Sequence, residues 1–206
     1  PGLLKPGDAT MDIVANLLSG GKNSRLYRRL VYDLQIAQDV AAFQQSQALG
    51  SNFVIIATAR PGQGLDKIQA VIDEELNKLR KEAPAAREMT RALNQTEASF
   101  YRNMERVGGF GGKADQLNAY FKAAGTPDFF DKDLARYRAV TAAEVQAAVD
   151  RYLPNDRRVE LSVTAAGEAA ARAIVERLAG DRLANPLMEQ HGVELLPDDD
   201  LFTSIA

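Results

Sequence analysis

The sequence predicts an α+β domain, a mostly antiparallel sheet with helices packed on one of its faces. Two extended stretches, at about residues 37–48 and 52–59, follow one another early in the chain. Apolar residues at helical spacing then dominate residues 64–152. Strands that are grouped apart from runs of helices are typical of an α+β layer arrangement.

Composition describes an ordinary globular protein and excludes several classes. Of the 206 residues, 46% are hydrophobic and 26% are charged, and the formal net charge is -3. This mixed, slightly acidic balance gives no electrostatic footprint for nucleic acid. The chain has no cysteine, which excludes disulfides and thiolate chemistry, and its single histidine, His191, excludes a two-histidine metal site within one copy.

The organisation predicted from the sequence is one domain over residues 1–164 followed by a tail over residues 165–206. The tail is rich in alanine, and this composition predicts a helix up to about Ala179. An acidic run follows at Asp198–Asp200. No apolar run approaches the ~20 residues that a membrane-spanning helix needs. Because the first residue is Pro1 and no signal peptide precedes it, we expect a piece of a longer protein.

The first elements are two helices and a hairpin. Asp8 is a suitable N-cap for a helix that Gly20 and Gly21 end. A second, basic helix is predicted over residues 24–33. The turn between the two strands is predicted at Gly50–Ser51. The apolar positions of the first helix recur at helical spacing, at Met11, Val14, Leu17 and Leu18.

Helices fill most of the remaining chain. A stripe from Leu65 to Leu79 predicts one helix, and a second stripe runs from Met89 to Met104. A glycine cluster ends that helix, and the pattern resumes through Phe121. A short helix is expected after Thr126–Pro127, and Thr141 with Glu144 forms a capping box for the last one. A half-buried strand is predicted at the alternating residues Val159, Leu161 and Val163.

No motif in the sequence specifies catalysis. The stretch Gly108–Lys113 is rich in glycine, but Ala114 stands where a phosphate-binding loop needs Ser or Thr, so a turn between helices is favoured. The second helix carries three arginines, Arg25, Arg28 and Arg29. Such a group more often forms a solvated helix face than a binding site for phosphate or an acidic peptide.

One segment carries a resemblance to a known family. The sequence from Leu18 to Leu30, Leu-Ser-Gly-Gly-Lys-Asn-Ser-Arg-Leu-Tyr-Arg-Arg-Leu, resembles the pitrilysin/insulinase-type zinc peptidases, a group that includes the mitochondrial processing peptidases. The same similarity continues through Gln35–Val40, and weaker similarity follows at Lys113–Leu117 and Gly125–Pro127. The resemblance covers roughly residues 11–164 and implies a metallopeptidase-like α+β domain.

The resemblance also implies a role. Family members pair a domain that carries the zinc motif H-x-x-E-H with a mate of the same fold that lacks it. This chain has no such motif and resembles the non-catalytic mate. The expected role is to close the proteolytic chamber and contact peptide substrate. No cofactor is expected in this chain, and zinc is expected in a catalytic partner domain on the same polypeptide or on a separate chain.

Two positions are implied to face substrate. In the family, an arginine and a tyrosine seven positions apart follow the segment matched by Ser24–Leu26 and reach across the chamber. Their equivalents here are Val31 and Gln38. Val31 cannot donate a hydrogen bond, and Gln38 offers only a neutral amide. An extended peptide can still add as a strand to an exposed sheet edge.

Alternatives to this role remain open at the level of sequence. One is a scaffold or assembly protein that has kept this fold and lost proteolytic activity. Core subunits of respiratory complexes are similar proteins of this kind. Another is a small-molecule or nucleotide enzyme that uses Gly108–Lys113. An isolated piece can also pair with a second copy to form a homodimer. From the resemblance alone, the expected compartment is the cell envelope or periplasm.

Overall fold

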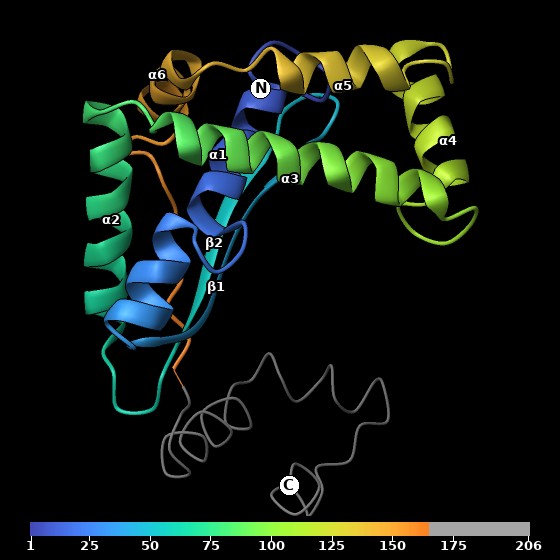
Figure 1. Cartoon of the computed structure of the whole chain (residues 1–206). Helices are drawn as coiled ribbons and strands as arrows, with labels where there is room; N and C mark the ends of the chain where they lie inside the picture. The colour runs from blue at the N-terminus through green and yellow to red at the C-terminus, as the bar shows by residue number, and fades with distance from the viewer. Residues whose placement is uncertain (165–206) are drawn as a thin grey trace, which may run out of the picture. The chain divides into compact units, whose positions relative to one another are not determined.

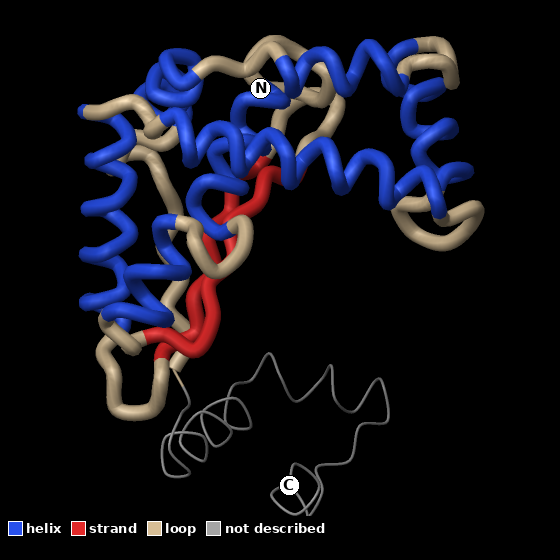
Figure 2. The backbone as a smooth tube through the Cα atoms, viewed as in Figure 1, coloured by secondary structure: helices blue, strands red, loops and turns tan. Residues whose placement is uncertain are grey.

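The structure, a computed structural model, describes residues 1–164 and confirms the α+β class. A compact unit spans Pro1–Glu160, and a second unit begins at Leu161. Figures 1 and 2 show helices gathered around a two-stranded sheet. The elements in chain order are α1 (Asp8–Ser19), η1 (Tyr27–Asp33), β1 (Ala37–Gln45), β2 (Asn52–Ala59), α2 (Leu65–Lys81), α3 (Ala86–Glu105), α4 (Lys113–Ala124), α5 (Phe130–Arg138) and α6 (Ala142–Tyr152).

The sheet is an antiparallel pair with one face against the helices. Val40 pairs with Ala57 and Ala42 with Ile55, and the register shifts between Ala37 and Asp39. Because side chains alternate between faces, one set lies toward the helices and the other lies outward. Residues of the inner set, such as Val40 and Ile55, pack on the core. Exposed residues of the outer set are Asp39, Ala41, Phe43, Ile56 and Thr58.

Helix α1 lies at the centre of the core. It packs on β1, α3, α5 and α6, so most of its circumference is covered. Its side chains Ile13, Val14, Leu17 and Leu18 have no exposed surface. Buried residues of the surrounding helices complete this core: Ile68, Val71, Leu76, Leu79, Met89, Ala92, Val145, Ala148 and Val149.

The capping box predicted for the last helix is present. The Thr141 hydroxyl accepts a hydrogen bond from the Glu144 N–H, and the Glu144 carboxylate accepts one from the Thr141 N–H at 2.8 Å. Both groups would otherwise lack a partner at the start of α6. The motif fixes the first turn of a helix whose Val145 and Val149 are buried against α1 and α2.

Thr141→Ala is expected to lower the free energy of unfolding by about 1 kcal/mol, because it removes this N-cap acceptor. Thr141→Ser keeps a hydroxyl at the same position and serves as the control. Urea unfolding of the two variants checks the prediction. Equal midpoints for both would contradict it.

Two predicted helix details at the N-terminal end are corrected. The N-cap of α1 is Gly7, with φ of 89°, and Asp8 is the first helical residue; its carboxylate accepts instead from the Leu4 N–H at 2.9 Å. The predicted second helix contains a π-helical segment, η1. Gln35, just after η1, has φ of 52°, so the chain turns sharply into β1 there.

The predicted strand at residues 159–163 is wrong. These residues have no regular secondary structure, and Val159 is 97% exposed. Alternation makes a strand only where a neighbouring strand offers hydrogen bonds, and β1 and β2 are the only strands among the described residues. Side-chain contacts to α2 hold the start of this segment instead, since Arg158 pairs with Asp73 and Glu160 accepts from Gln69.

Other predictions for the C-terminal region lie outside the described residues. These are the tail helix up to Ala179, the acidic run at Asp198–Asp200 and His191. The division of the chain between residues 164 and 165 therefore stays a prediction.

Candidate functional site

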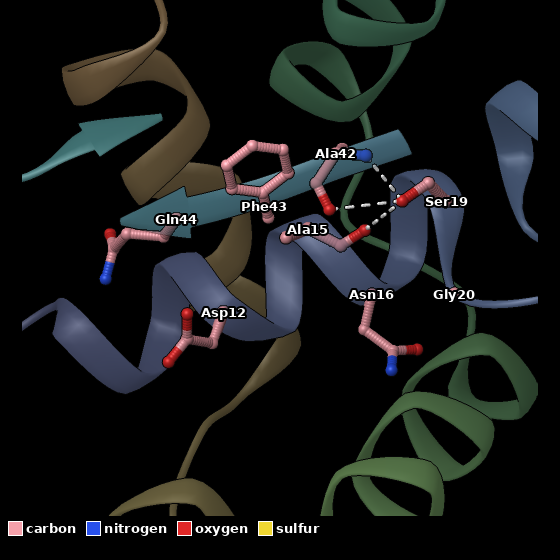
Figure 3. Close-up of a pocket in the computed structure, with 8 residues that line it drawn as sticks. All are labelled: Asp12, Ala15, Asn16, Ser19, Gly20, Ala42, Phe43 and Gln44. Atoms are coloured by element: carbon pink, nitrogen blue, oxygen red, sulfur yellow. Dashed lines mark hydrogen bonds between the residues drawn. The ribbon is translucent and has the colours of Figure 1, made fainter. Parts of the chain in front are cut away.

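A groove lies between α1 and the edge strand β1 (Figure 3). Its volume is about 250 Å³, which is smaller than the roughly 300–1,000 Å³ of sites for drug-sized ligands. This volume suits a single long side chain. The lining residues are Asp12, Ala15, Asn16, Ser19, Gly20, Ala42, Phe43 and Gln44.

One side chain of α1 satisfies the backbone of β1 inside this groove. The Ser19 hydroxyl accepts from the Ala42 N–H at 2.7 Å and lies 3.1 Å from the Ala42 carbonyl oxygen, to which it can donate (Figure 3). A neighbouring strand would supply the same donor and acceptor. The edge of β1 is therefore already occupied at Ala42, so a peptide strand could pair there only by displacing Ser19.

Asp12 is the one ionisable residue of the groove. Its carboxylate accepts a hydrogen bond from the Tyr137 hydroxyl at 2.6 Å, and no cationic side chain of the described residues lies within 4 Å of it. Burial raises the pKa of Asp12 from 3.8 to about 6, and the nearby Asp8 adds to this effect. The groove thus carries a carboxylate whose charge is poorly compensated.

A buried ionic cluster lies beside Asp12. Arg136 of α5 pairs with Asp8 at 3.0 Å and with Asp133 at 2.5 Å, and Tyr120 of α4 donates to Asp133 at 2.9 Å. Asp8 is 2% exposed and also accepts from Gln44 at 2.7 Å. Burial raises the pKa of Asp133 as well. One guanidinium therefore pairs with two buried carboxylates and acts on Asp12 only from a distance.

Asp12→Asn is expected to stabilise the chain at neutral and alkaline pH. Because the pKa of Asp12 is raised in the folded state, the folded chain binds a proton more tightly than the unfolded chain, and the charged form costs stability above pH ~6. The amide can still accept from Tyr137. The gain should be about 2 kcal/mol at pH 8 and shrink as the pH falls towards 4.

Urea unfolding of the natural chain and of the Asp12→Asn variant across this pH range checks the prediction. A difference between them that stays constant with pH would contradict it.

Comparison with known proteins relates the first part of the chain to one family. Residues 1–96 match the family model described as the peptidase M16 inactive domain. This match covers less than half of the chain, so the chain is similar to that family over these residues. The M16 match includes α1, η1, β1 and β2, and therefore the whole groove. It confirms the resemblance to zinc peptidases that the segment at Leu18–Leu30 carries.

Solved structures share the fold. The inactive peptidase domain assigned to a zinc protease of Bordetella parapertussis is 23% identical with a TM-score of 0.66, over 77% of this chain and 84% of that one. A protease from Helicobacter pylori is 19% identical with a TM-score of 0.66, over 75% of this chain and 37% of that one.

A peptidase M16 inactive domain from Pseudomonas fluorescens is 20% identical with a TM-score of 0.55, over 73% of this chain and 35% of that one. The chain thus spans little more than a third of the Helicobacter and Pseudomonas proteins. No curated protein sequence matches it.

The two positions implied by the resemblance lie outside the groove lining. Val31 lies in η1 and is partly buried against the core. Gln38 is exposed at the irregularity in β1, where its amide donates to the Ala59 carbonyl at 3.4 Å. The structure does not bring them together with Asp12, and their role towards substrate stays a prediction.

The residues that line the groove were not predicted from the sequence as site residues. Asp12 and Asn16 interrupt the apolar pattern of α1 four residues apart, so they share one face of that helix. Polar residues on a helix that is otherwise buried were the available signal. Ser19 gave no comparable signal, because a serine before two glycines also fits an ordinary helix end.

The basic helix face is mostly used within the domain. Arg25 makes two hydrogen bonds of 2.8 Å to Glu88 on α3, and Arg29 pairs with Glu74 on α2 at 2.8 Å. Arg28 is the exposed member and lies 3.6 Å from Asp33. These pairs attach the segment from Arg25 to Arg29 to α3 and α2, which explains two of the three arginines without a ligand.

The glycine-rich stretch joins α3 to α4 as a turn. Gly109 and Gly111 have φ of 81° and 72°, a conformation that glycine adopts readily. The Gly111 N–H donates to the Asp115 carboxylate at 3.0 Å, so a negative side chain already occupies the position a phosphate would need. This contact argues against the nucleotide-enzyme alternative.

The described residues hold no group of His, Asp and Glu side chains that could bind a metal ion. None of the helices in the described range is long and apolar enough to cross a membrane.

Proposed function

We propose that this chain is the non-catalytic half of a zinc metallopeptidase. In this role it closes the proteolytic chamber against a catalytic domain, which holds the zinc, and contacts the peptide substrate. The match of residues 1–96 to the inactive-domain family carries the proposal. The catalytic domain lies on the same polypeptide or on a separate chain.

The groove between α1 and β1 is the proposed contact with peptide. Phe43 is 41% exposed at its rim and offers an apolar surface, while Ala15 and Ala42 leave room beside it. The two strands are both edge strands among the described residues, so an extended peptide finds unpaired backbone groups next to the groove. Because Ser19 already hydrogen-bonds the backbone of Ala42, such a peptide would contact the groove at this position through its side chains.

Fluorescence anisotropy with the full chain and short labelled peptides tests this contact. Saturable binding is expected, and Phe43→Ser should weaken it by about tenfold, since buried aromatic contacts contribute strongly to binding. Ile56→Ser is the matched control, because Ile56 is 51% exposed on the same outer face of the sheet but does not line the groove. Equal affinities for the two variants would contradict the groove as the contact.

Two other outcomes bear on the role of the whole domain. Absence of any peptide binding, together with a gene product that holds no zinc, would favour the scaffold alternative. We also propose that the isolated chain forms a homodimer through the surface that contacts the catalytic domain in the complete protein. Sedimentation of the isolated chain tests this oligomeric state.

A further inference from the structure

We propose that the groove between α1 and β1 is a subsite for a lysine or arginine side chain of an extended peptide, with the Asp12 carboxylate as its partner. This inference rests on the proposed function and names the residue class that its peptide carries. Four observations support it: the incomplete hydrogen bonding of Asp12, the sign of the surrounding charges, the size of the groove and the chemistry of its walls.

The first observation is the incomplete hydrogen bonding of Asp12. Its Oδ2 accepts from Tyr137, and its Oδ1 has no donor among the described residues. The side chain is only partly buried and lines the groove. A buried or half-buried carboxylate is costly unless a donor or cation meets it. An ammonium or guanidinium group entering the groove would supply both.

The second observation is the excess of negative charge around this position. Asp8 lies one helical turn before Asp12, and Asp133 lies across from it on α5. The single guanidinium of Arg136 is shared by Asp8 and Asp133. The lining contains no lysine or arginine. The charges of the groove are therefore complementary to a cation and unfavourable to an anion.

The third and fourth observations concern size and walls. A volume of about 250 Å³ admits one long side chain, and Ala15, Ala42 and Phe43 form an apolar wall for its methylene stem. Asp12 and Asn16 point to the same side of α1 (Figure 3). The Asn16 Oδ1 atom is buried and has no donor in the described part of the chain. A guanidinium has several N–H donors, so it can form more hydrogen bonds to these oxygen atoms than a neutral side chain can.

The charge of Asp12 makes this binding depend on pH. The groups that act on Asp12 are Asp8 on α1 and Tyr137, Arg136 and Asp133 on α5; β1 faces it with uncharged side chains. The raised pKa of about 6 means that the carboxylate is charged at pH 7.5 and largely neutral at pH 5. Binding of a cationic side chain should therefore weaken as the pH falls through about 6.

The test uses the full chain and short acetylated peptides that differ at one central residue. The central residues are arginine, lysine, citrulline and glutamate. At pH 7.5 the arginine and lysine peptides should bind about tenfold more tightly than the citrulline peptide, which keeps the shape of arginine without its charge. The glutamate peptide should bind most weakly.

Asp12→Asn tests the residue itself. It should remove the tenfold preference and its pH dependence while leaving citrulline binding unchanged. Asp150→Asn, on the exposed side of α6, is the matched control and should keep both. Thermal unfolding of each variant verifies the fold.

The outcomes separate this inference from the proposed function. If arginine and citrulline peptides bind equally well, or if Asp12→Asn keeps the preference, the inference is wrong and peptide contact stands. If no peptide binds, the proposed contact is wrong as well.

Discussion

Arg136→Met is expected to lower the free energy of unfolding by about 3–5 kcal/mol, because it leaves two buried carboxylates without a counter-charge. Asp8 and Asp133 both depend on this guanidinium, and their side chains are 2% and 9% exposed. Methionine keeps much of the volume of arginine, so the loss reports the charge more than the packing. Urea unfolding at pH 7 measures the effect.

A matched control and a rescue make this prediction specific. Arg138 lies on the same helix and pairs with Glu97 at the surface, so Arg138→Met should change stability little. Adding Asp8→Asn and Asp133→Asn to Arg136→Met should restore part of the loss, because the buried charges are then removed together. A loss for Arg136→Met as small as that for Arg138→Met would contradict the account of the cluster.

Leu17→Ala is expected to lower the free energy of unfolding by about 2–5 kcal/mol. Leu17 has no exposed surface, and its helix is enclosed by β1, α3, α5 and α6. A cavity left between so many fixed elements collapses poorly, which places the cost in the upper part of that range.

Leu117→Ala on α4 is the control for this substitution. Leu117 is 37% exposed, so the same change of side chain removes much less buried surface. Urea unfolding of both variants gives the comparison. Similar losses at the two positions would show that α1 is not the centre of the core.

Regular elements were predictable from the sequence because each depends on local pattern. The stripe from Leu65 to Leu79 and the capping box at Thr141 specify α2 and α6 through neighbours three and four residues away. The apolar run in β2 likewise identifies a strand of that length. Alternation at Val159 failed, because pairing needs a second strand that no local pattern reveals.

The groove was not predictable, because it depends on contacts between elements. Ser19 meets Ala42 over 23 positions of sequence, and Tyr137 reaches Asp12 over 125. No local pattern indicates that these residues are neighbours. The family resemblance instead pointed to Val31 and Gln38, which lie elsewhere on η1 and β1.

The cluster and the groove share α1, which links stability to the proposed contact. Asp8 and Asp12 are one turn apart, yet Arg136 forms an ion pair only with Asp8. The same arrangement that makes Arg136 important for folding leaves Asp12 available at the surface of the groove. Variants at Arg136 should therefore affect stability first, and variants at Asp12 should affect binding.

The most direct test of the central claim measures zinc content and peptide cleavage of the complete gene product. If the catalytic domain is on a separate chain, that chain is added. Both quantities are compared between the product that contains residues 1–206 and the product that lacks them. The account predicts that zinc remains bound when these residues are removed, whereas cleavage is lost. Cleavage that continues unchanged without them, or a complete product that holds no zinc and cuts no peptide, would contradict it.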